Sequence, residues 1–281
     1  MIDLISKQIR LTKSVIKGIG DDTAVLPLSK DKYQLLTTDM LAENVHFTRR
    51  MKASDVGHKA LACNISDIAA MGGRPTFAVV SIGLPNGLSA AYVKELYQGM
   101  QQLATRYKVS IVGGDTIKSD QIVINVALLG EVSKKDLVTR DGAKSGDWIF
   151  VTGALGGSLK SHHHLHFEPC VAQSQFLVKK FKPSAMMDIS DGLAGDLNHL
   201  LKASKVGADL WYQDIPLNQG CSLAQALSDG EDFELLFTLS DARSAKLLDW
   251  QTKNKQWYFY PVGRITADPT QLVKVKGFTH F

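Results

Sequence analysis

The sequence contains little cysteine, and its cysteines are not arranged to bind zinc or to cross-link the chain. Cys63, Cys170 and Cys221 are the three cysteines among 281 residues, and no two of them form a C-x-x-C pair. An odd number of widely spaced cysteines argues against a disulfide framework and against a zinc knuckle. We therefore expect a reducing compartment and predict a cytoplasmic location.

Long apolar runs are absent as well. No stretch reaches the roughly 18 apolar residues of a membrane-spanning helix. Charged residues interrupt the apolar positions of residues 1–13, MIDLISKQIRLTK, so we expect no signal peptide. The formal net charge is only +4 and is spread along the chain, which favours neither nucleic acid nor a membrane surface as a partner.

Two common nucleotide-binding signatures are also missing. The chain has no G-x-x-x-x-G-K-[ST] loop, and the set of protein-kinase motifs is absent. Any nucleotide site must therefore be of another kind. Glycine next to a strand end or a helix start can still supply backbone N–H donors to a phosphate, and the candidates are 113–114 and 153–157.

The composition is that of an ordinary globular protein, with 44% hydrophobic and 21% charged residues. A chain of this length favours two domains. Predicted strands and helices intermix throughout, which indicates an α+β or mixed α/β fold. The polar, glycine-containing stretch 133–147 favours a boundary there, so we predict an N-terminal domain at 1–135 and a C-terminal domain at 136–281.

Hydrophobic periodicity and glycine or proline stop signals predict the individual elements. Helices are expected at 2–12, 54–71, 89–107, 171–180, 192–203 and 242–250. Strands are expected at 23–28, 33–38, 77–84, 109–112, 121–132, 148–152, 185–188, near 209 and at 232–239.

Carboxylates gather at the junctions between these elements. They are Asp21 and Asp22, Asp39, Asp115, and Asp188 with Asp191. A single aspartate in such a place is usually a turn or cap residue, but several that converge would need cations to offset their repulsion. Oxygen ligands without histidine or cysteine select hard ions such as Mg²⁺. Mg²⁺ in turn indicates a phosphate substrate, and phosphoryl transfer needs little covalent help from the protein.

Seven motifs in order resemble the thiamine-monophosphate kinase family, which belongs to the aminoimidazole-ribonucleotide-synthetase superfamily. They cover nearly the whole chain, and each motif is weak alone. They are GIGDDTAV at 18–25, TTDMLAENVHF at 37–47, KALACNISDIAAMGG at 59–73, IVGGDT at 111–116, TRDGAKSGDWIFVTG at 139–153, MDISDGLAGDLNHL at 187–200 and GEDFELLF at 230–237.

The resemblance implies site residues at the matching positions. The implied magnesium ligands are Asp22, Thr37, Thr38, Asp39, Asp67, Asp115, Asp188 and Asp191. The implied ATP contacts are Gly114, Asp115, Arg140 and Ser190, and the implied substrate contacts are His46, Glu231 and Phe278. Among these residues, Asp39, Asp115 and Asp191 are expected to be catalytic.

The resemblance also implies a fold and a reaction. The expected N-terminal domain forms a barrel across a homodimer, an α/β-type C-terminal domain follows it, and the active site lies between the domains. A terminal phosphate oxygen of thiamine monophosphate would attack the γ-phosphorus of ATP in line, with several Mg²⁺ ions bound, and would give thiamine diphosphate and ADP. No phosphoenzyme is expected.

Two alternatives stay open. The first is another ATP-using member of the superfamily, such as a cyclising ligase or a selenophosphate synthetase, although residues 1–20 lack the reactive cysteine that the latter would require. The second is a catalytically impaired nucleotide-binding protein, because the segment 158–170 is shorter than is usual in the family and Cys170 stands where the family usually has arginine. The histidine-rich tract 162–166 is interpreted as a loop without a role.

Overall fold

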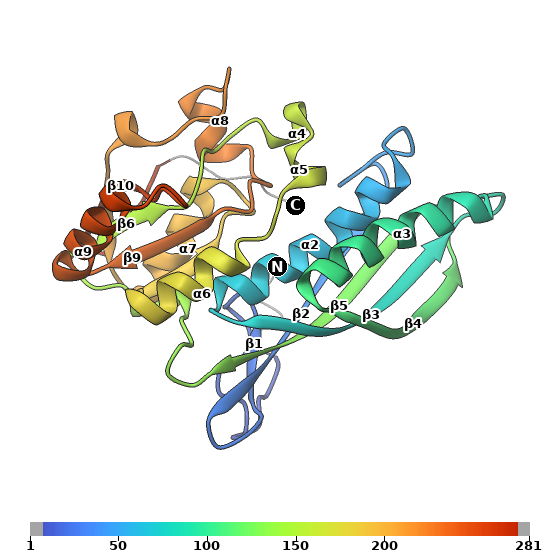
Figure 1. The fold of residues 1–281 in the computed structure, drawn as a ribbon, viewed down its shortest axis with the longest axis horizontal. Helices are drawn as coiled ribbons and strands as arrows, with labels where there is room; N and C mark the ends of the chain where they lie inside the picture. The colour runs from blue at the N-terminus through green and yellow to red at the C-terminus, as the bar shows by residue number, and fades with distance from the viewer. Residues whose placement is uncertain (1–7, 275–281) are drawn as a thin grey trace.

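The first sheet of the computed structural model, which describes residues 8–274, is built from the N-terminal half of the chain (Figure 1). Its strands lie in the order β1-β2-β5-β3-β4. They are β1 (Ala24–Pro27), β2 (Lys32–Ala42), β3 (Arg74–Leu84), β4 (Ser110–Lys118) and β5 (Val123–Ser133). β3 and β4 are parallel, and the other neighbours are antiparallel. β1 pairs only with residues 33–36 of β2, so the second half of β2 has a strand partner on one side only.

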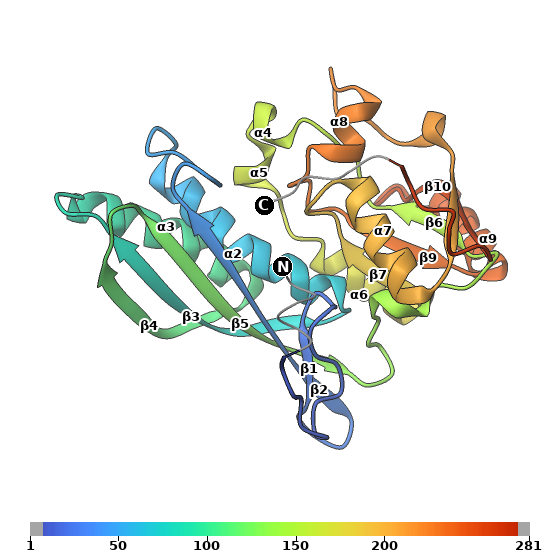
Figure 2. The same ribbon diagram turned by 180° about the vertical axis from the view of Figure 1, so that it is seen from behind.

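Two long helices, α2 (Ala53–Ala70) and α3 (Ala90–Tyr107), cover one face of this sheet (Figures 1 and 2). Along β5, buried Ile124, Val126 and Leu128 alternate with partly exposed residues, which is the pattern of a strand with one covered face. The two helices approach closely at Gly99, where a Cβ atom would lie 1.8 Å from the carbonyl oxygen of Ser54. Glycine is therefore required at this crossing.

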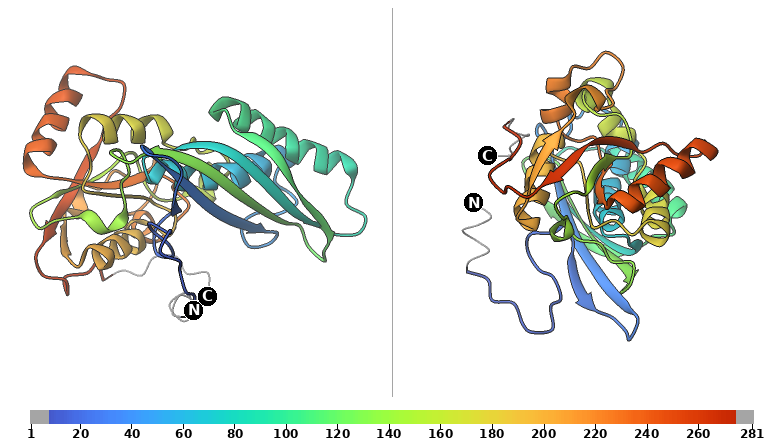
Figure 3. Two further views of the ribbon diagram at one scale, coloured as in Figure 1. Left: turned by 90° about the horizontal axis from the view of Figure 1, so that it is seen from below. Right: turned by 90° about the vertical axis from the view of Figure 1, so that its left-hand side faces the viewer.

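The opposite face of the first sheet is apolar and exposed, and the elements within residues 8–274 leave it uncovered (Figure 3). The exposed side chains on this sheet include Leu36, Met40, Phe77, Val79, Val112 and Ile117. The sheet is open in the single chain.

The second sheet is covered by helices on both faces. Its order is β7-β9-β6-β10-β8, with β6 (Trp148–Val151), β7 (Ala185–Asp188), β8 (Gly207–Leu210), β9 (Leu235–Leu239) and β10 (Tyr260–Thr266). One hydrophobic cluster joins it to α7 (Leu193–Ser204), and another joins it to α6 (Val171–Lys180) and α9 (Asp241–Lys253). The short helices are α4 (Ser158–Ser161), α5 (His163–His166) and α8 (Leu223–Ser228). Two 3₁₀ turns are also present, η1 (Arg140–Gly142) and η2 (Tyr212–Asp214).

Most predicted helices and strands are confirmed, and the differences are as follows. Residues 8–12 are not helical, and the rest of the helix predicted at 2–12 lies outside the described residues. The strand predicted to end before Gly113 continues to Lys118, and β9 begins at Leu235 rather than at residue 232. β10 and α8 were not predicted, because β10 contains Pro261 and Gly263 and α8 spans only six residues. The prediction of a loop for the histidine-rich tract is wrong in part: residues 163–166 form the short helix α5, and α4 precedes it, because one helical turn is too short to leave a periodic pattern. Within residues 8–274, no helix combines the length and apolar character needed to cross a membrane.

Candidate active site

Helix α2 contacts both the first sheet and the second sheet, and one stripe of its side chains faces the junction. Lys59, Cys63 and Asp67 are spaced four residues apart and therefore lie along one side of the helix. Ser66 on the same helix donates a hydrogen bond of 2.5 Å to Asp188 at the end of β7. The helix thus ties the two halves of the chain together and lines the space between them.

Three carboxylates converge at one end of this junction. Asp22 precedes β1, Asp67 lies on α2 and Asp188 ends β7, and one oxygen of each lies within 4.8 Å of the others. Asp39 on β2 lines the adjoining pocket together with Asp67 and Asp188. Carboxylates brought this close repel one another unless cations or protons intervene.

Burial and mutual repulsion raise the pKa values of these groups. Burial, and then the charge of Asp22, raise the pKa of Asp39 to about 6. Burial is also the largest cause for Asp22 and Asp188, whose pKa values rise to about 6, although Arg140 opposes both shifts. Burial followed by the charge of Asp39 raises the pKa of Asp67 well above its usual value. The folded site therefore favours bound protons or bound cations.

One arginine partly balances this charge. The Arg140 guanidinium donates to Asp22, and its backbone N–H lies 3.3 Å from both carboxylate oxygens of Asp21. Within residues 8–274, Asp22 Oδ2 and Arg140 Nε are buried without a hydrogen-bond partner. A buried carboxylate oxygen without a partner, beside two more carboxylates, fits a hard divalent cation bound by oxygen ligands.

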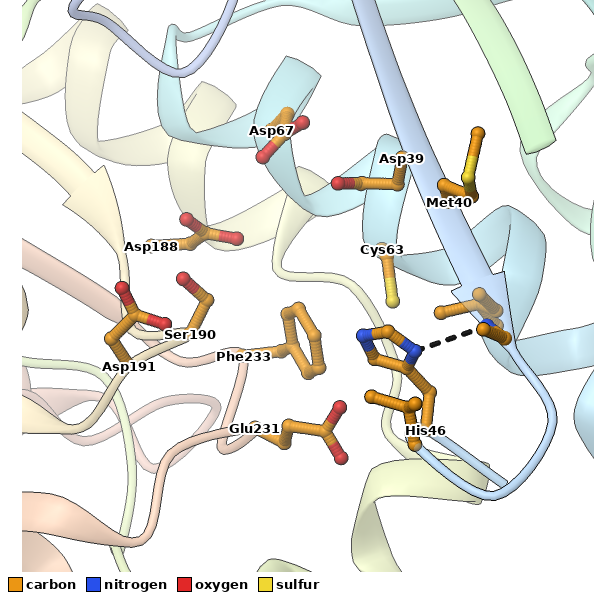
Figure 4. A pocket seen from close by; sticks show the side chains of 13 residues that line it. Asp39, Met40, His46, Cys63, Asp67, Asp188, Ser190, Asp191, Glu231 and Phe233 are labelled. Carbon is orange, nitrogen blue, oxygen red and sulfur yellow. Dashed lines mark hydrogen bonds between the residues drawn. The ribbon is translucent and has the colours of Figure 1, made fainter. Parts of the chain in front are cut away.

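A pocket of about 470 Å³ extends from this acidic end along α2. Figure 4 shows Asp39, Asp67 and Asp188 toward one end and Glu231 with His46 toward the other, while Asp191 lies beside Ser190, next to Asp188. His46 Nδ1 accepts a hydrogen bond of 3.0 Å from the Ala42 backbone N–H, which places the proton of a neutral ring on Nε2. The pocket therefore joins an anionic end to an end with aromatic and polar side chains.

An aromatic stack supports the second end. Phe233 lines the pocket and stacks on Phe167 with ring centroids 4.1 Å apart. Phe167 in turn packs edge-on against His58 of α2, and His58 Nε2 lies 2.8 Å from the Phe167 carbonyl oxygen. The Phe233 ring is thereby fixed as a flat apolar wall of the pocket.

The structure brings together most of the residues predicted for the site. Those that line the pocket or its acidic end are Asp22, Thr37, Asp39, His46, Asp67, Arg140, Asp188, Ser190, Asp191 and Glu231. Thr37 belongs to this set because its hydroxyl donates to Asp67 at 2.5 Å. The Thr38 side chain points to the other face of β2, where it bonds to Asn125 and to the carbonyl of Val126. Phe278 lies outside the described residues.

Gly114 and Asp115 stand apart from this pocket in the single chain. Both are exposed on the edge strand β4, and β5 and β3 lie between β4 and β2. The pairing register runs from Asp39 through Val126 and Val80 to Gly114. Three strand spacings put β4 about 14 Å from β2. Asp115 therefore does not join the acidic cluster of its own chain.

The glycine-rich segment 153–157, which we considered as a phosphate-binding loop, already uses two of its amides within the protein. The Gly156 N–H donates to both oxygens of Asp232 at 3.0 Å, and the Gly157 N–H donates to Asp229 at 3.3 Å. Asp232 also accepts from Ser158 at 2.5 Å. These two amides hold the loop in place rather than facing a ligand.

Cys170, where we noted a departure from the family pattern, is buried beside another carboxylate. Its thiol donates to Glu234 Oε2 at 3.6 Å, and Thr152 donates to the same oxygen at 2.5 Å. Burial raises the pKa of Glu234. In the histidine-rich tract, His164 is buried and lies 2.9 Å from the Ser158 carbonyl oxygen, which is a structural contact.

Sequence reasoning missed several residues of the site. They are Met40, Cys63 and Phe233, which line the pocket, and Lys59 and Ser66, which support it from α2. The signal that could have revealed them is the four-residue spacing of Lys59, Cys63 and Asp67, because it places a charged residue and a metal-ligand candidate on one helix face.

Comparison with known proteins first gives the class of the fold. Residues 20–132 match the family model described as AIR synthase related protein, N-terminal domain. The thiamine-monophosphate kinase of Aquifex aeolicus is 37% identical, over 100% of this chain and 97% of that protein. The enzyme of the same name from Buchnera aphidicola (subsp. Schizaphis graminum) is 33% identical, over 96% of this chain and 94% of that protein. The chain belongs to the thiamine-monophosphate kinase family.

A solved structure agrees with this assignment. AaThiL complexed with AMPPCP and TMP superposes with a TM-score of 0.87 at 35% identity, covering 100% of this chain and 96% of that chain.

Proposed function

We propose that this protein phosphorylates thiamine monophosphate with ATP and Mg²⁺ to give thiamine diphosphate and ADP. The observation that carries the proposal is the single pocket that joins a carboxylate cluster to an end lined by His46, Glu231 and Phe233. Family membership over the full chain and the relative's complex with AMPPCP and TMP support the same reaction. A cytoplasmic location follows from this biosynthetic role.

In this proposal the acidic end binds the phosphates. Asp22, Asp39, Asp67, Asp188 and Asp191 would hold Mg²⁺, which supplies charge neutralisation and alignment of the phosphoryl groups. Arg140, already beside Asp22, is placed to accept a nucleotide phosphate, and Ser190 lies at the same end of the pocket. Until cations are bound, the clustered carboxylates would repel an anionic nucleotide, so nucleotide binding should depend on Mg²⁺.

The other end holds the acceptor. Phe233 offers an apolar ring face, the Glu231 carboxylate accepts hydrogen bonds, and His46 adds a polar ring to the lining. Its phosphate would then point along α2 toward Asp67. One phosphate oxygen forms the new bond to the γ-phosphorus while the bond to the β,γ-bridging oxygen breaks, so ADP leaves and no phosphoenzyme forms.

The exposed apolar face of the first sheet supports a homodimer. A second copy that covers this face and brings its β4 edge to the open second half of β2 would close the two sheets into a barrel. That contact would carry Gly114 and Asp115 of one copy toward Asp39 of the other. We include these two residues in the site on this basis, and we place the domains at 1–135 and 136–281 around the two sheets.

The alternatives differ in what they bind and release. Another ATP-using superfamily member would hydrolyse ATP without making thiamine diphosphate, and an impaired protein would bind nucleotide without turnover. The shortened segment 158–170, in which Cys170 lies beside Glu234, motivates the second alternative. The intact carboxylate cluster and the formed acceptor end favour the kinase.

The direct test incubates the purified protein with ATP, Mg²⁺ and one of thiamine monophosphate, thiamine or no acceptor, and detects thiamine diphosphate by mass. We expect product from the monophosphate alone, and a loss of at least about 100-fold in turnover for Asp39→Asn, which removes a charge at the acidic end. Asp249→Asn, an exposed carboxylate on α9, is the matched control. ADP release without thiamine diphosphate would contradict the proposal.

A further inference from the structure

Lys59 is a buried cation that the proposed reaction does not use. Its side chain is 0% exposed, and its ammonium lies 2.7 and 2.8 Å from the two carboxylate oxygens of Glu231 and 3.1 Å from the carbonyl oxygen of His46. An ammonium has three N–H donors, and here it has three acceptors. All of its hydrogen bonds go to the two residues at the acceptor end of the pocket.

The Glu231 loop needs such a support. Gly230, Glu231 and Phe233 all have positive φ angles of 73°, 57° and 53°, and the last two are not glycine. Residues with a Cβ atom adopt this region only when their surroundings hold them there. The Glu231 and Phe233 backbone N–H groups donate to the carbonyls of Ser190 and Ile189 at 2.7 and 2.8 Å. Those bonds lie within the second half of the chain, whereas Lys59 on α2 fixes the loop from the first half.

A purely stabilising ion pair does not explain this arrangement well. The desolvation penalty of a buried ammonium offsets much of the favourable energy of its ion pair, so a buried pair contributes little net stability. Lys59 instead links the two walls of the pocket, the His46 segment that follows β2 and the loop that precedes β9. The Glu231 side chain remains 17% exposed although Lys59 binds both of its oxygens. Its remaining acceptor positions can therefore face a ligand.

We propose that Lys59 is a positioning residue for the acceptor subsite. Lys59 keeps Glu231 and His46 at a fixed distance from each other. A thiamine-type heteroaromatic ring can then bind between these two residues without contacting Lys59. Because its charge balances that of Glu231, the acceptor end recognises its ligand by hydrogen bonds and ring contacts rather than by net charge. This inference rests on the proposed function for the identity of the acceptor.

Lys59→Met tests the proposal, since methionine keeps a similar length and removes the charge and all three donors. We expect the KM for thiamine monophosphate to rise at least tenfold, while the KM for ATP stays within about twofold. Lys253→Met, which removes an exposed ammonium paired with Asp249 on α9, should leave both constants unchanged. An unchanged KM for the acceptor, or equal rises in both constants together with a lower Tm, would overturn the positioning role.

Two further measurements separate this inference from the proposed function. In Lys59→Met, the hydrogen exchange of the Glu231 and Phe233 amides should accelerate at least tenfold, and this readout requires no turnover. In a double-mutant cycle that combines Lys59→Met with Glu231→Gln, the effects of the two substitutions on the KM for thiamine monophosphate should be strongly non-additive, because Lys59 acts through Glu231. A wild-type protein that makes no thiamine diphosphate would defeat the proposed function alone, whereas unchanged amide exchange would defeat the positioning role whatever the acceptor.

Discussion

At the level of single residues, folding buries carboxylates at the acidic end of the pocket close enough together for their charges to repel. Asp22 and Asp188 are 8% and 3% exposed, and burial raises the pKa of each to about 6. The fold nevertheless keeps them together, through Ser66 on one carboxylate and Arg140 on the other. Groups that oppose the stability of the empty fold in this way are typical of sites built for a charged ligand.

These raised pKa values predict that the free energy of unfolding depends on pH. An unfolded aspartate loses its proton near pH 4, whereas folded Asp188 keeps it until about pH 6. Its stabilising contribution is therefore complete below pH 4 and is lost as the pH rises through 6. Asp188→Asn does not titrate, so in metal-free buffer it should gain about 2 kcal/mol relative to wild type between pH 4 and pH 7.

Urea unfolding at several pH values measures this difference. Asp249→Asn, whose carboxylate is exposed on α9, should show no such gain. Saturating Mg²⁺ should stabilise the wild-type protein at pH 7 and reduce the difference. A constant difference between Asp188→Asn and wild type across the pH range would contradict the assigned cause.

At the level of elements, strand β4 decides where the glycine-aspartate motif stands. Local pattern predicted a short strand that ends before Gly113, but pairing with β3 continues through Gly114 and Asp115 to Lys118. The strand can lie this close because a Cβ atom at Gly114 would be 1.8 Å from the Val80 carbonyl oxygen. The glycine therefore has a role in sheet packing whether or not it also contacts a nucleotide.

A pair of neighbouring glycines tests the packing role. Gly114→Ala should lower the free energy of unfolding by at least about 2 kcal/mol, because the added methyl group forces β4 away from β3. Gly113→Ala should cost less than about 1 kcal/mol, since the nearest atom to its Cβ lies 4.0 Å away. Denaturant titration of both variants measures the costs, and equal costs would show that the close approach at Gly114 is unimportant.

At the level of the whole molecule, the candidate site lies between the two sheets formed within residues 8–274, and an apolar face of the first sheet is left open by those residues. The pocket has its acidic end and its acceptor end within a single chain, yet Asp115 lies beyond two intervening strands. The proposed homodimer through the open face would account for the exposed apolar face and for the distant Asp115, because it would cover Phe77 and Val79 and would supply Asp115 from the second copy.

Mixed dimers test this arrangement. Asp39→Asn and Asp115→Asn should each reduce turnover at least about 100-fold when purified alone. Co-expressed together, they should recover about a quarter of wild-type activity, since half of the dimers are mixed and each mixed dimer has one intact site. The mass of each assembly in solution is the accompanying control. No recovery from verified mixed dimers would mean that Asp115 acts within its own chain, and an Asp115→Asn protein with full activity on its own would mean that Asp115 has no role.

The sequence by itself determined the local features of this protein. Periodicity placed α3 and β5 almost to the residue, because a helix with one buried stripe and a strand with one buried face leave repeating patterns. The carboxylates at element junctions were visible for a similar reason, since residue type and neighbouring glycines are local facts. The order of motifs was sufficient to identify the family.

Only the tertiary structure decided which of these residues meet. Asp22, Asp67 and Asp188 come from a loop, a helix and a strand that are distant in sequence, and they converge because α2 packs between the two sheets. The same packing buries Lys59 under Glu231, while the strand order removes Asp115 from the pocket of its own chain. Sequence patterns report the faces of single elements, whereas strand order and helix packing set the distances between elements, and chemistry depends on those distances.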